Sequence, residues 1–343
     1  MAYLIAIDTS AEFEHSFGSM IDCTGVSAAS LMEPNSASPF DIEGYLRGQS
    51  NIIDQALEVQ LARYPGESQT LFQALRYGVF PGGKRIRPIL TLAAAEIFRA
   101  DVQDILPFAC AVELIHAYSL IHDDLPALDN DDLRRGQPTA HKVYGEGMAL
   151  LAGDALLTEA FRIMSDTQTA RQLAPEFVLD AIRELAQAAG ALGLVGGQAL
   201  DLEAEERDVD LPMVEMIHVR KTGALILASV RIGARLGGAS DSNLASLSRY
   251  GEYLGLAFQI ADDLLDANAG VALGEHAESS GRERKKATYP SVVGVVTARE
   301  RLAELLKLSV RELDGFERRG QPLAAIARYI VGRAIHLDAA RSH

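Results

Sequence analysis

The sequence predicts an all-α fold in one domain, and three observations lead to this class. Apolar residues recur at intervals of three and four from about residue 41 almost to the end of the chain, as in helices with one buried face. Runs that alternate β-branched and polar residues, the sign of strands, are scarce. No linker rich in Pro, Gly or Ser divides this region, so a chain of 343 residues that is 48% hydrophobic is expected to bury one large core.

The expected helices follow one another closely along the chain. In order they cover residues 41–64, 67–79, 87–99, 102–123, 145–166, 172–191, 194–206, 211–236, 241–267, 289–313 and 321–340. Pro88, Pro212 and Pro322 stand in the first turns of three of them, where a missing N–H costs no hydrogen bond. The joins are marked by Gly136, Gly237, Gly238 and Gly320.

Residues 1–40 differ in composition from residues 41–343, which we expect to form the folded domain. They are rich in Ser and Ala, they carry Asp and Glu, and they contain no Lys or Arg, since the first basic residue is Arg47. They therefore lack the basic start of a signal peptide and the arginines of a transit peptide. We expect a weakly ordered N-terminal extension, although a translated vector segment or a later start at Met20 or Met32 fits as well.

Charge and cysteine content narrow the classes of partner. A net charge of −15 and a pI near 5.0 argue against nucleic acid, whose phosphates require a broad basic surface. Two cysteines, Cys23 and Cys110, indicate no disulfide framework and favour the reducing cytoplasm. Because we find no run of 18 apolar residues, we expect no transmembrane segment.

Two aspartate clusters are the best indication of function. Asp123, Asp124 and Asp129 follow one apolar helix, and Asp262, Asp263 and Asp266 follow another. Grouped carboxylates repel one another unless a cation lies among them, and Mg²⁺ takes oxygen ligands while leaving positions open for phosphates. The alternative for either cluster alone is an acidic helix end in water.

The residues around the second cluster favour a buried site. Gln259, Asp262, Asp263 and Asp266 lie three, four and seven positions apart and so share one helix face. An apolar stripe runs beside them through Leu244, Leu247, Gly251, Leu254, Phe258, Ala261 and Leu265. Carboxylates at the inner ends of core helices need a partner, because burying unpaired charge is costly.

A compact basic loop stands out in this acidic chain. It has the sequence GGKRIRP (82–88), with glycines that let backbone N–H groups approach an anion at a helix start. The spacing from Gly78 to Lys84 matches a P-loop, but Arg85 replaces the required Ser or Thr and no strand precedes it. Two further cations, Arg134 and Arg135, follow the first aspartate cluster and suit phosphate oxygens, unless they only neutralise the acidic residues beside them.

Six blocks in order identify a resemblance. They are GGKRIRP (82–88), IHAYSLIHDDLPALDNDDLRRG (115–136), GGQALDL (196–202), KTGALI (221–226), FQIADDLLD (258–266) and KKATYP (285–290). Over about residues 41–340 the chain resembles the trans-isoprenyl diphosphate synthases, and most closely the bacterial farnesyl diphosphate synthases. The resemblance implies helices around a deep central cavity (the isoprenoid synthase fold), a homodimer, and head-to-tail condensation of isopentenyl diphosphate with an allylic diphosphate.

The resemblance also implies roles for individual residues. Asp123 and Asp129, supported by Asp124, are expected to bind two Mg²⁺ ions. Asp262 is expected to be the main ligand of a third ion, with Asp263 and Asp266 in its outer coordination shell. Arg134 and Lys221 are expected to hold the allylic diphosphate. The isopentenyl diphosphate is assigned to Lys84, Arg87, His116 and Arg135, with His116 lying seven residues before Asp123 and so on its helix face. Gln198, Asp201, Thr222 and Gln259 are expected at the reacting centre, and Lys286 at the diphosphates.

This chemistry requires the residue types that are present. Departure of the allylic diphosphate needs cations, which Lys221, Arg134 and metal ions supply. Oxygens of Thr222 and Gln259 are expected to stabilise the carbocation left behind, while apolar walls exclude water. The released proton passes to the diphosphate, so we expect no protein general base.

Product length is expected to depend on the helix below the first aspartate cluster. Tyr118 lies five residues before Asp123, and with its neighbour Ser119 it is the expected floor for the growing chain. An aromatic residue there, with two extra residues inside the first aspartate motif, resembles enzymes that make the fifteen-carbon product. The alternative role for Tyr118 is simple packing between helices.

Other functions remain open from the sequence. The alternative most similar in chemistry is a geranylgeranyl diphosphate synthase. A terpene cyclase is a further alternative, which the second aspartate cluster and the basic loop oppose. A catalytically silent subunit is suggested by one departure of the sequence from the family pattern. That departure is Glu275, which stands where the family has a diphosphate-binding Lys, with Arg282, Arg284 or Lys285 as possible replacements.

Overall fold

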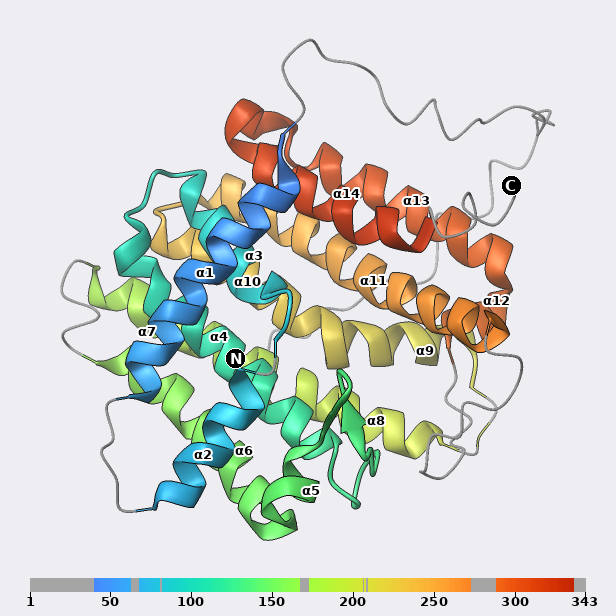
Figure 1. The fold of residues 1–343 in the computed structure, drawn as a ribbon. Helices are drawn as coiled ribbons and strands as arrows, with labels where there is room; N and C mark the ends of the chain where they lie inside the picture. The colour runs from blue at the N-terminus through green and yellow to red at the C-terminus, as the bar shows by residue number, and fades with distance from the viewer. Residues whose placement is uncertain are drawn as a thin grey trace, which may run out of the picture. The chain divides into compact units, whose positions relative to one another are not determined.

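Helix α4 (Val102–Asp123) lies at the centre of the fold, and its composition explains why. Apolar residues surround its axis, and 14 of its 22 residues are buried. Helices α1 (Ile42–Leu61), α2 (Gln69–Val79), α3 (Ile86–Glu96) and α6 (Glu146–Ser165) all pack against it (Figure 1). Any polar side chain on such a helix must find a partner inside the protein.

The computed structural model describes residues 40–62, 68–80, 82–166, 173–205, 207, 209–272 and 288–335, with the backbone alone for 268–272. From Phe40 onward the chain forms one compact unit. Residues 1–39 of the expected extension lie outside the described residues. So do Glu275, Arg282, Arg284, Lys285 and Lys286.

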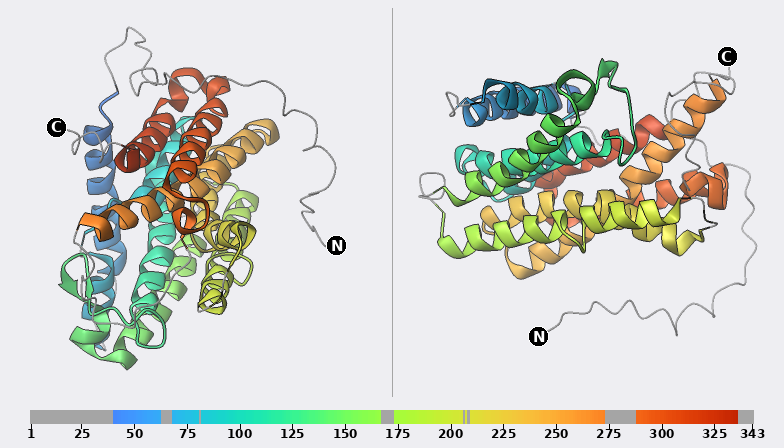
Figure 2. Two further views of the ribbon diagram at one scale, coloured as in Figure 1. Left: turned by 90° about the vertical axis from the view of Figure 1, so that its right-hand side faces the viewer. Right: turned by 90° about the horizontal axis from the view of Figure 1, so that it is seen from below.

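Helices dominate the described part of the chain, as the sequence predicts, and the all-α class is confirmed. The remaining elements are β1 (Leu133–Arg134), β2 (Gln137–Pro138), α5 (Ala140–Tyr144), α7 (Pro175–Ala189), α8 (Leu194–Ala204), α9 (Leu211–His218), the π-helix η2 (Val219–Gly223), α10 (Ala224–Leu236), α11 (Asp241–Ala272), α12 (Tyr289–Val293), α13 (Val295–Arg311), the 3₁₀ helix η3 (Asp314–Gly320) and α14 (Gln321–Ile335). Seen from below, many of these helices run side by side in a common direction (Figure 2).

Two helices expected to be continuous are interrupted. The predicted helix at 211–236 contains η2, a stretch with one extra residue per turn, between α9 and α10. The predicted helix at 289–313 divides at Gly294, whose φ of 84° and ψ of 153° lie outside the helical region and suit glycine. Neither interruption changes the apolar spacing enough to be visible in the sequence.

A short hairpin between α4 and α5 was not predicted. Strands β1 and β2 pair antiparallel through Arg134 and Gln137, with Arg135 and Gly136 in the turn. Both turn residues have positive φ, 55° and 76°, which suits a tight two-residue hairpin. The expected join at Gly136 is therefore the turn that presents two arginines.

Within the described part of the chain, one helix passes the length and composition test for a membrane span. It is α4, with a mean hydropathy of 1.5 over its most apolar window, of which 72% is buried inside the protein. This result neither confirms nor contradicts the expectation of no transmembrane segment, because the buried core helix of a soluble protein passes the same test. Since α4 is the central helix, its apolar surface already has protein partners.

Candidate active site

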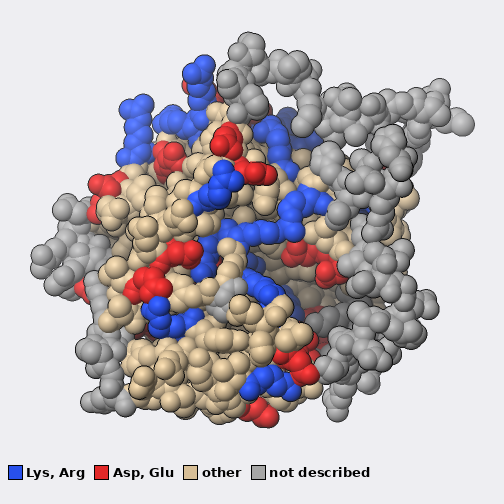
Figure 3. Space-filling view, in the orientation of Figure 1, with Lys and Arg blue, Asp and Glu red and all other residues tan. Residues whose placement is uncertain are grey.

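The two aspartate helices meet at one cavity of about 590 Å³. Asp123 enters it from the end of α4 and Asp262 from α11, and the C-terminal helix α14 closes one side. Other predicted site residues that line it are Lys84, Arg87, His116, Ser119, Arg134, Arg135, Gln198, Lys221, Thr222 and Gln259. On the face shown in Figure 3, Lys and Arg side chains gather around a hollow, with acidic side chains beside it.

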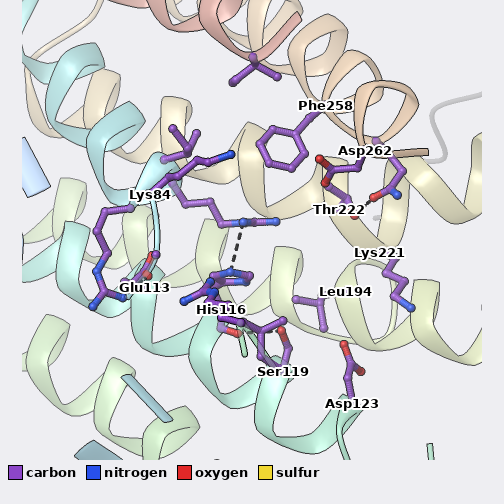
Figure 4. A pocket seen from close by; sticks show the side chains of 18 of the residues that line it. Lys84, Glu113, His116, Ser119, Asp123, Leu194, Lys221, Thr222, Phe258 and Asp262 are labelled. Atoms are coloured by element: carbon purple, nitrogen blue, oxygen red, sulfur yellow. Dashed lines mark hydrogen bonds and ion pairs between the residues drawn. The ribbon is translucent and has the colours of Figure 1, made fainter. Parts of the chain in front are cut away.

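The site residues divide between two sides of the cavity (Figure 4). Lys84 and His116 lie on one side. Asp123, Lys221 and Asp262 lie on the other, with Thr222 beside Asp262. The cavity therefore offers cations at two separate places, as two diphosphates would require.

Asp124 is held by an arginine behind the first cluster. It caps α4 and is 3% exposed, and its Oδ1 accepts a hydrogen bond of 2.7 Å from Arg134 Nε in β1. Burial raises the pKa of Asp124, and Arg134 opposes the rise. The backbone N–H of Asp129 donates to the carbonyl oxygen of Asp123 at 2.8 Å, which turns the chain back toward the helix end.

In the second cluster the two neighbouring aspartates, Asp262 and Asp263, have different surroundings. Asp262 lines the cavity, and burial together with Asp266 raises its pKa to about 7. Asp263 is 6% exposed and accepts from Tyr289 N at 2.7 Å and Gln259 Nε2 at 3.0 Å. Its Oδ2 also lies 3.4 Å from His218 Nε2. Asp263 therefore anchors neighbouring groups, whereas Asp266 is exposed.

These carboxylates fit a divalent cation. A cation would favour the charged form of Asp262, which burial otherwise opposes near neutral pH. Among the described residues, no three His, Cys, Asp or Glu side chains are grouped closely enough to hold a metal alone. Metal binding here would need oxygens from another source, as Mg²⁺ commonly takes from phosphates.

The π-helix η2 places two residues, Lys221 and Thr222, at the cavity. Lys221 Nζ donates to Asp201 Oδ2 in α8 at 2.6 Å, and Thr222 Oγ1 donates to Gln259 Oε1 at 2.7 Å. Burial works to lower the pKa of Lys221, but Asp201 and Asp123 outweigh it and raise the pKa. Because the Gln259 amide donates to Asp263, its oxygen is left facing Thr222.

Two glycines let other helices approach η2 closely. A Cβ on Gly197 of α8 would lie 2.2 Å from Lys221 N, and one on Gly255 of α11 would lie 2.7 Å from Gly223 Cα. Both distances are far below contact distance, so α8 and α11 hold η2 only because glycine stands at these positions.

The opposite side of the cavity is cationic. Arg87 Nη1 lies 3.5 Å from His116 Nε2, and the guanidinium lies over the ring of Phe258, 5.6 Å from its centre. Burial, then Arg87 and Arg135, lower the pKa of His116 well below its usual range, so the imidazole is neutral at pH 7. Arg87 Nε is buried and has no hydrogen-bond partner among the described residues. An unpaired buried cationic donor in a cavity that Lys84, His116 and Arg135 also line is suited to an anion.

Tyr118 does not line the cavity described, whereas Ser119 does. The Tyr118 ring is 5% exposed and packs edge-to-face on His122, with 5.7 Å between ring centres. His122 in turn fits against Gly153 of α6, where a Cβ would lie 2.1 Å from His122 Nε2. The Tyr118 ring thus packs on a neighbour that contacts α6, and its role as the floor remains a prediction.

Several lining residues were not predicted. From α14 come Tyr329, Ile330 and Arg333, and from other elements Arg85, Ile86, Glu113, Leu120, Leu194, Phe258 and Leu265. The helical spacing of apolar residues in the predicted helix at 321–340 indicates that α14 has a buried face. Nothing in its sequence shows which elements meet that face. Glu113 did carry a signal, since it is an acidic residue inside an apolar helix.

Comparisons with known proteins agree with this geometry. The family model described as Polyprenyl synthetase matches residues 68–314. The chain is 44% identical over 298 residues to a dimethylallyltranstransferase of Fischerella ambigua, covering 86% of this chain and 84% of that one. It is 42% identical over 292 residues to the farnesyl diphosphate synthase of Geobacillus stearothermophilus, covering 85% and 98%. It is also 42% identical over 300 residues to geranylgeranyl pyrophosphate synthase 7 of Arabidopsis thaliana, covering 86% and 84%.

Solved structures show the same likeness. The crystal structure of an FPP/GFPP synthase from Zymomonas mobilis has a TM-score of 0.76 at 38% identity, covering 85% of this chain and 99% of that one. A geranyltransferase from Legionella pneumophila has a TM-score of 0.77 at 31% identity, covering 86% and 97%.

Proposed function

The chain belongs to the polyprenyl synthetase family, and from this membership we propose that it condenses isopentenyl diphosphate with dimethylallyl and then geranyl diphosphate to give farnesyl diphosphate. Prenyl transfer is the activity of the family, so the proposal concerns the product and the residues. The observation that carries it is the placement of Asp123 and Asp262 on one cavity with two separate groups of cations.

We assign the cationic residues of the cavity to the two substrates by their position. We assign the allylic diphosphate to Lys221 and Arg134, which lie beside the aspartates, and isopentenyl diphosphate to Lys84, Arg87, His116 and Arg135. Mg²⁺ held by Asp123, Asp129 and Asp262 would supply the positive charge that lets the allylic C–O bond ionise. We propose three ions, with Asp124 and Asp263 supporting the ligands.

The reacting centre needs oxygens that do not react irreversibly. The Thr222 hydroxyl and the Gln259 amide oxygen are hydrogen-bonded to one another, and Gln198 from α8 borders the same cavity. These dipoles favour a developing carbocation without supplying a free nucleophile. Phe258, Leu194 and Leu265 provide apolar walls that limit access of water.

A product assay tests the proposal. The protein is incubated with Mg²⁺, isopentenyl diphosphate and dimethylallyl diphosphate, and the chain length of the products is measured. A fifteen-carbon product supports the proposal; a cyclised hydrocarbon or no elongation overturns it. In the same assay Lys84→Ala should raise mainly the KM for isopentenyl diphosphate, and Lys221→Ala mainly that for the allylic substrate. A rise in the same KM for both variants contradicts the assignment of the two sites.

The second candidate is synthesis of the twenty-carbon geranylgeranyl product. Two observations favour it, namely that relatives of similar identity carry that name and that Tyr118 does not line the cavity. A twenty-carbon main product from the unmodified protein would select it.

A further inference from the structure

Arg85 stands between two predicted ligands of isopentenyl diphosphate, yet its side chain is committed elsewhere. It is the residue before α3, with a positive φ of 49°, and only 3% of its side chain is exposed. All three of its nitrogens donate within the protein: Nε to Asp54 Oδ1 at 2.8 Å, Nη1 to Glu113 Oε1 at 2.7 Å and Nη2 to the carbonyl oxygen of Val79 at 2.7 Å. Each side-chain nitrogen of Arg85 therefore already donates within the protein, and a guanidinium that is 3% exposed offers a substrate phosphate little access to its two remaining N–H groups.

Glu113 is the acceptor that matters most for the cavity. It lies on the central helix α4, its side chain is 5% exposed, and it borders the cavity on the same side as Lys84 and His116 (Figure 4). Burial lowers the pKa of Arg87 and of Arg135, and Glu113 is the first charge that opposes this for both. The Glu113 carboxylate thus lies close to two cations assigned to the substrate.

Without Arg85, Glu113 would be a buried carboxylate that lacks its ion-pair partner. Such a charge is strongly unfavourable, so it would recruit the nearest cation that can reach it. The candidates are Arg87 and Arg135, and Arg87 already has a nitrogen without a partner. An arginine drawn onto Glu113 is no longer available to a diphosphate.

We propose that Arg85 is a positioning residue for isopentenyl diphosphate: by pairing with Glu113 it leaves Arg87 and Arg135 free to bind the substrate. The inference rests on the proposed function, because it takes these arginines as substrate ligands. Arg85 itself does not touch the substrate. It sets the charge available on one side of the cavity and leaves the allylic side, with Lys221 and Arg134, unaffected.

Steady-state kinetics of four variants tests this, with isopentenyl diphosphate and geranyl diphosphate varied in turn while the other substrate is saturating. Arg85→Gln should raise the KM for isopentenyl diphosphate about tenfold, the loss expected when one charge-assisted contact weakens. The KM for geranyl diphosphate should stay within about threefold of the unmodified protein. Arg85→Lys keeps the positive charge beside Glu113 and should give a smaller rise.

The remaining two variants separate charge from structure. Arg85→Gln/Glu113→Gln removes both charges, so the KM for isopentenyl diphosphate should return most of the way to its original value. Asp54→Asn is the matched control, because Asp54 pairs with the same arginine but its side chain is 46% exposed and does not line the cavity. It should leave that KM unchanged, whatever its effect on thermal stability.

The outcomes are distinguishable. A folded Arg85→Gln variant with an unchanged KM, or a double variant as impaired as the single one, overturns the inference. Should Arg85→Gln fail to fold, the double variant and Arg85→Lys still decide. A KM for isopentenyl diphosphate raised about tenfold or more in the double variant, where neither charge remains, contradicts the inference, and so does a rise of that size in Arg85→Lys, where the positive charge is kept. If the unmodified protein makes no prenyl product, the proposed function fails first; if Lys84→Ala raises the KM and Arg85→Gln does not, only the present inference fails.

Discussion

At the scale of single residues, opposite charges around the cavity are already paired. Lys221 binds Asp201 and Arg134 binds Asp124, both with their side chains mostly buried. Each pair holds a cation at the cavity wall in a defined direction, which reduces the ordering required when a diphosphate binds. Asp262 differs, because burial and the charge of Asp266 both raise its pKa and so disfavour its charged form.

The first prediction follows from this difference. Asp262→Ala should lower turnover by orders of magnitude, because it removes a carboxylate assigned to a metal ion. The free energy of unfolding measured without Mg²⁺ should stay the same or rise, since a buried charge with a raised pKa is lost. Near-normal turnover would contradict the assignment of Asp262 as a ligand.

The second prediction concerns product length. Tyr118 is buried on α4 next to Ser119, which lines the cavity, so removing its ring should open space that the growing chain could enter. Tyr118→Ala should shift the products toward twenty carbons or more, measured by chromatography of the dephosphorylated products. His122→Gln, which alters the ring that Tyr118 packs on, should shift them less. Products that stay at fifteen carbons in Tyr118→Ala would show that the floor lies elsewhere.

At the scale of elements, η2 is the part of the fold that brings the site together. A π-helical turn places Lys221 and Thr222 on the cavity, one bonded to α8 and the other to α11. Isolated π-turns inside α-helices are often found at functional sites. Here the turn is held by close backbone approaches at Gly197 and Gly255, which an ordinary side chain would prevent.

The third prediction tests this packing. Gly255→Ala would place a Cβ 2.7 Å from Gly223 Cα and so push η2 out of position. We expect turnover to fall ~10–100-fold, because small misplacements of catalytic groups are costly. Gly48→Ala in α1 is the control, since a Cβ there meets nothing within 4 Å and alanine favours helices. Equal turnover in the two variants would contradict a positioning role for Gly255.

The fourth prediction concerns the ion pairs that join α7 to α10. Glu184 accepts from Arg231 Nη2 at 2.6 Å and Nε at 2.8 Å. Burial works to raise the pKa of Glu184, but Arg231 and Arg235 outweigh it and lower the pKa. A lowered pKa in the folded state contributes stability above the unfolded pKa, and this contribution is lost as pH falls through the folded pKa.

Glu184→Gln should therefore reduce the free energy of unfolding by about 2 kcal/mol at pH 7. The difference from the unmodified protein should shrink between about pH 5 and pH 3, where the carboxylate becomes protonated. Denaturant titrations at several pH values measure this. A difference that grows as the solution is acidified would mean that the ion pair does not account for it.

At the scale of the whole molecule, several large apolar side chains of the described residues remain exposed. Large apolar side chains are exposed from β1 to α8, namely Leu133, Val143, Leu150, Leu151, Phe177, Leu179, Leu192, Val195 and Leu202. Exposed apolar side chains often belong to protein interfaces when they lie together. We propose that these contribute to a homodimer interface, the oligomeric state that the resemblance implies.

The fifth prediction tests that proposal. Leu151, which is 54% exposed on α6, should tolerate Leu151→Glu in the folded subunit but not at an apolar interface. Sedimentation should show a dimer for the unmodified protein and a larger share of monomer for the variant. A monomer in both cases would remove the proposal, and Thr297→Glu, which adds the same single negative charge at an exposed position of α13, serves as a charge-matched control.

The sequence by itself determined the helical class, the main helices and the residues capable of binding diphosphate and metal. It could do so because helical period and the chemistry of Asp, Arg and Lys are local properties of the chain. Asp123 and Asp262, far apart in sequence, were expected to face one cavity, and they do.

Only the tertiary structure decided which neighbour of each pair faces the cavity. Asp262 lines it while Asp263 anchors Gln259 and Tyr289, and Ser119 lines it while Tyr118 does not. Adjacent residues on a helix point about 100° apart, so the choice depends on how each helix is rotated against its neighbours. That rotation is set by contacts such as Gly255 on Gly223 and Arg85 on Glu113, which join residues distant in sequence and leave no periodic trace in it.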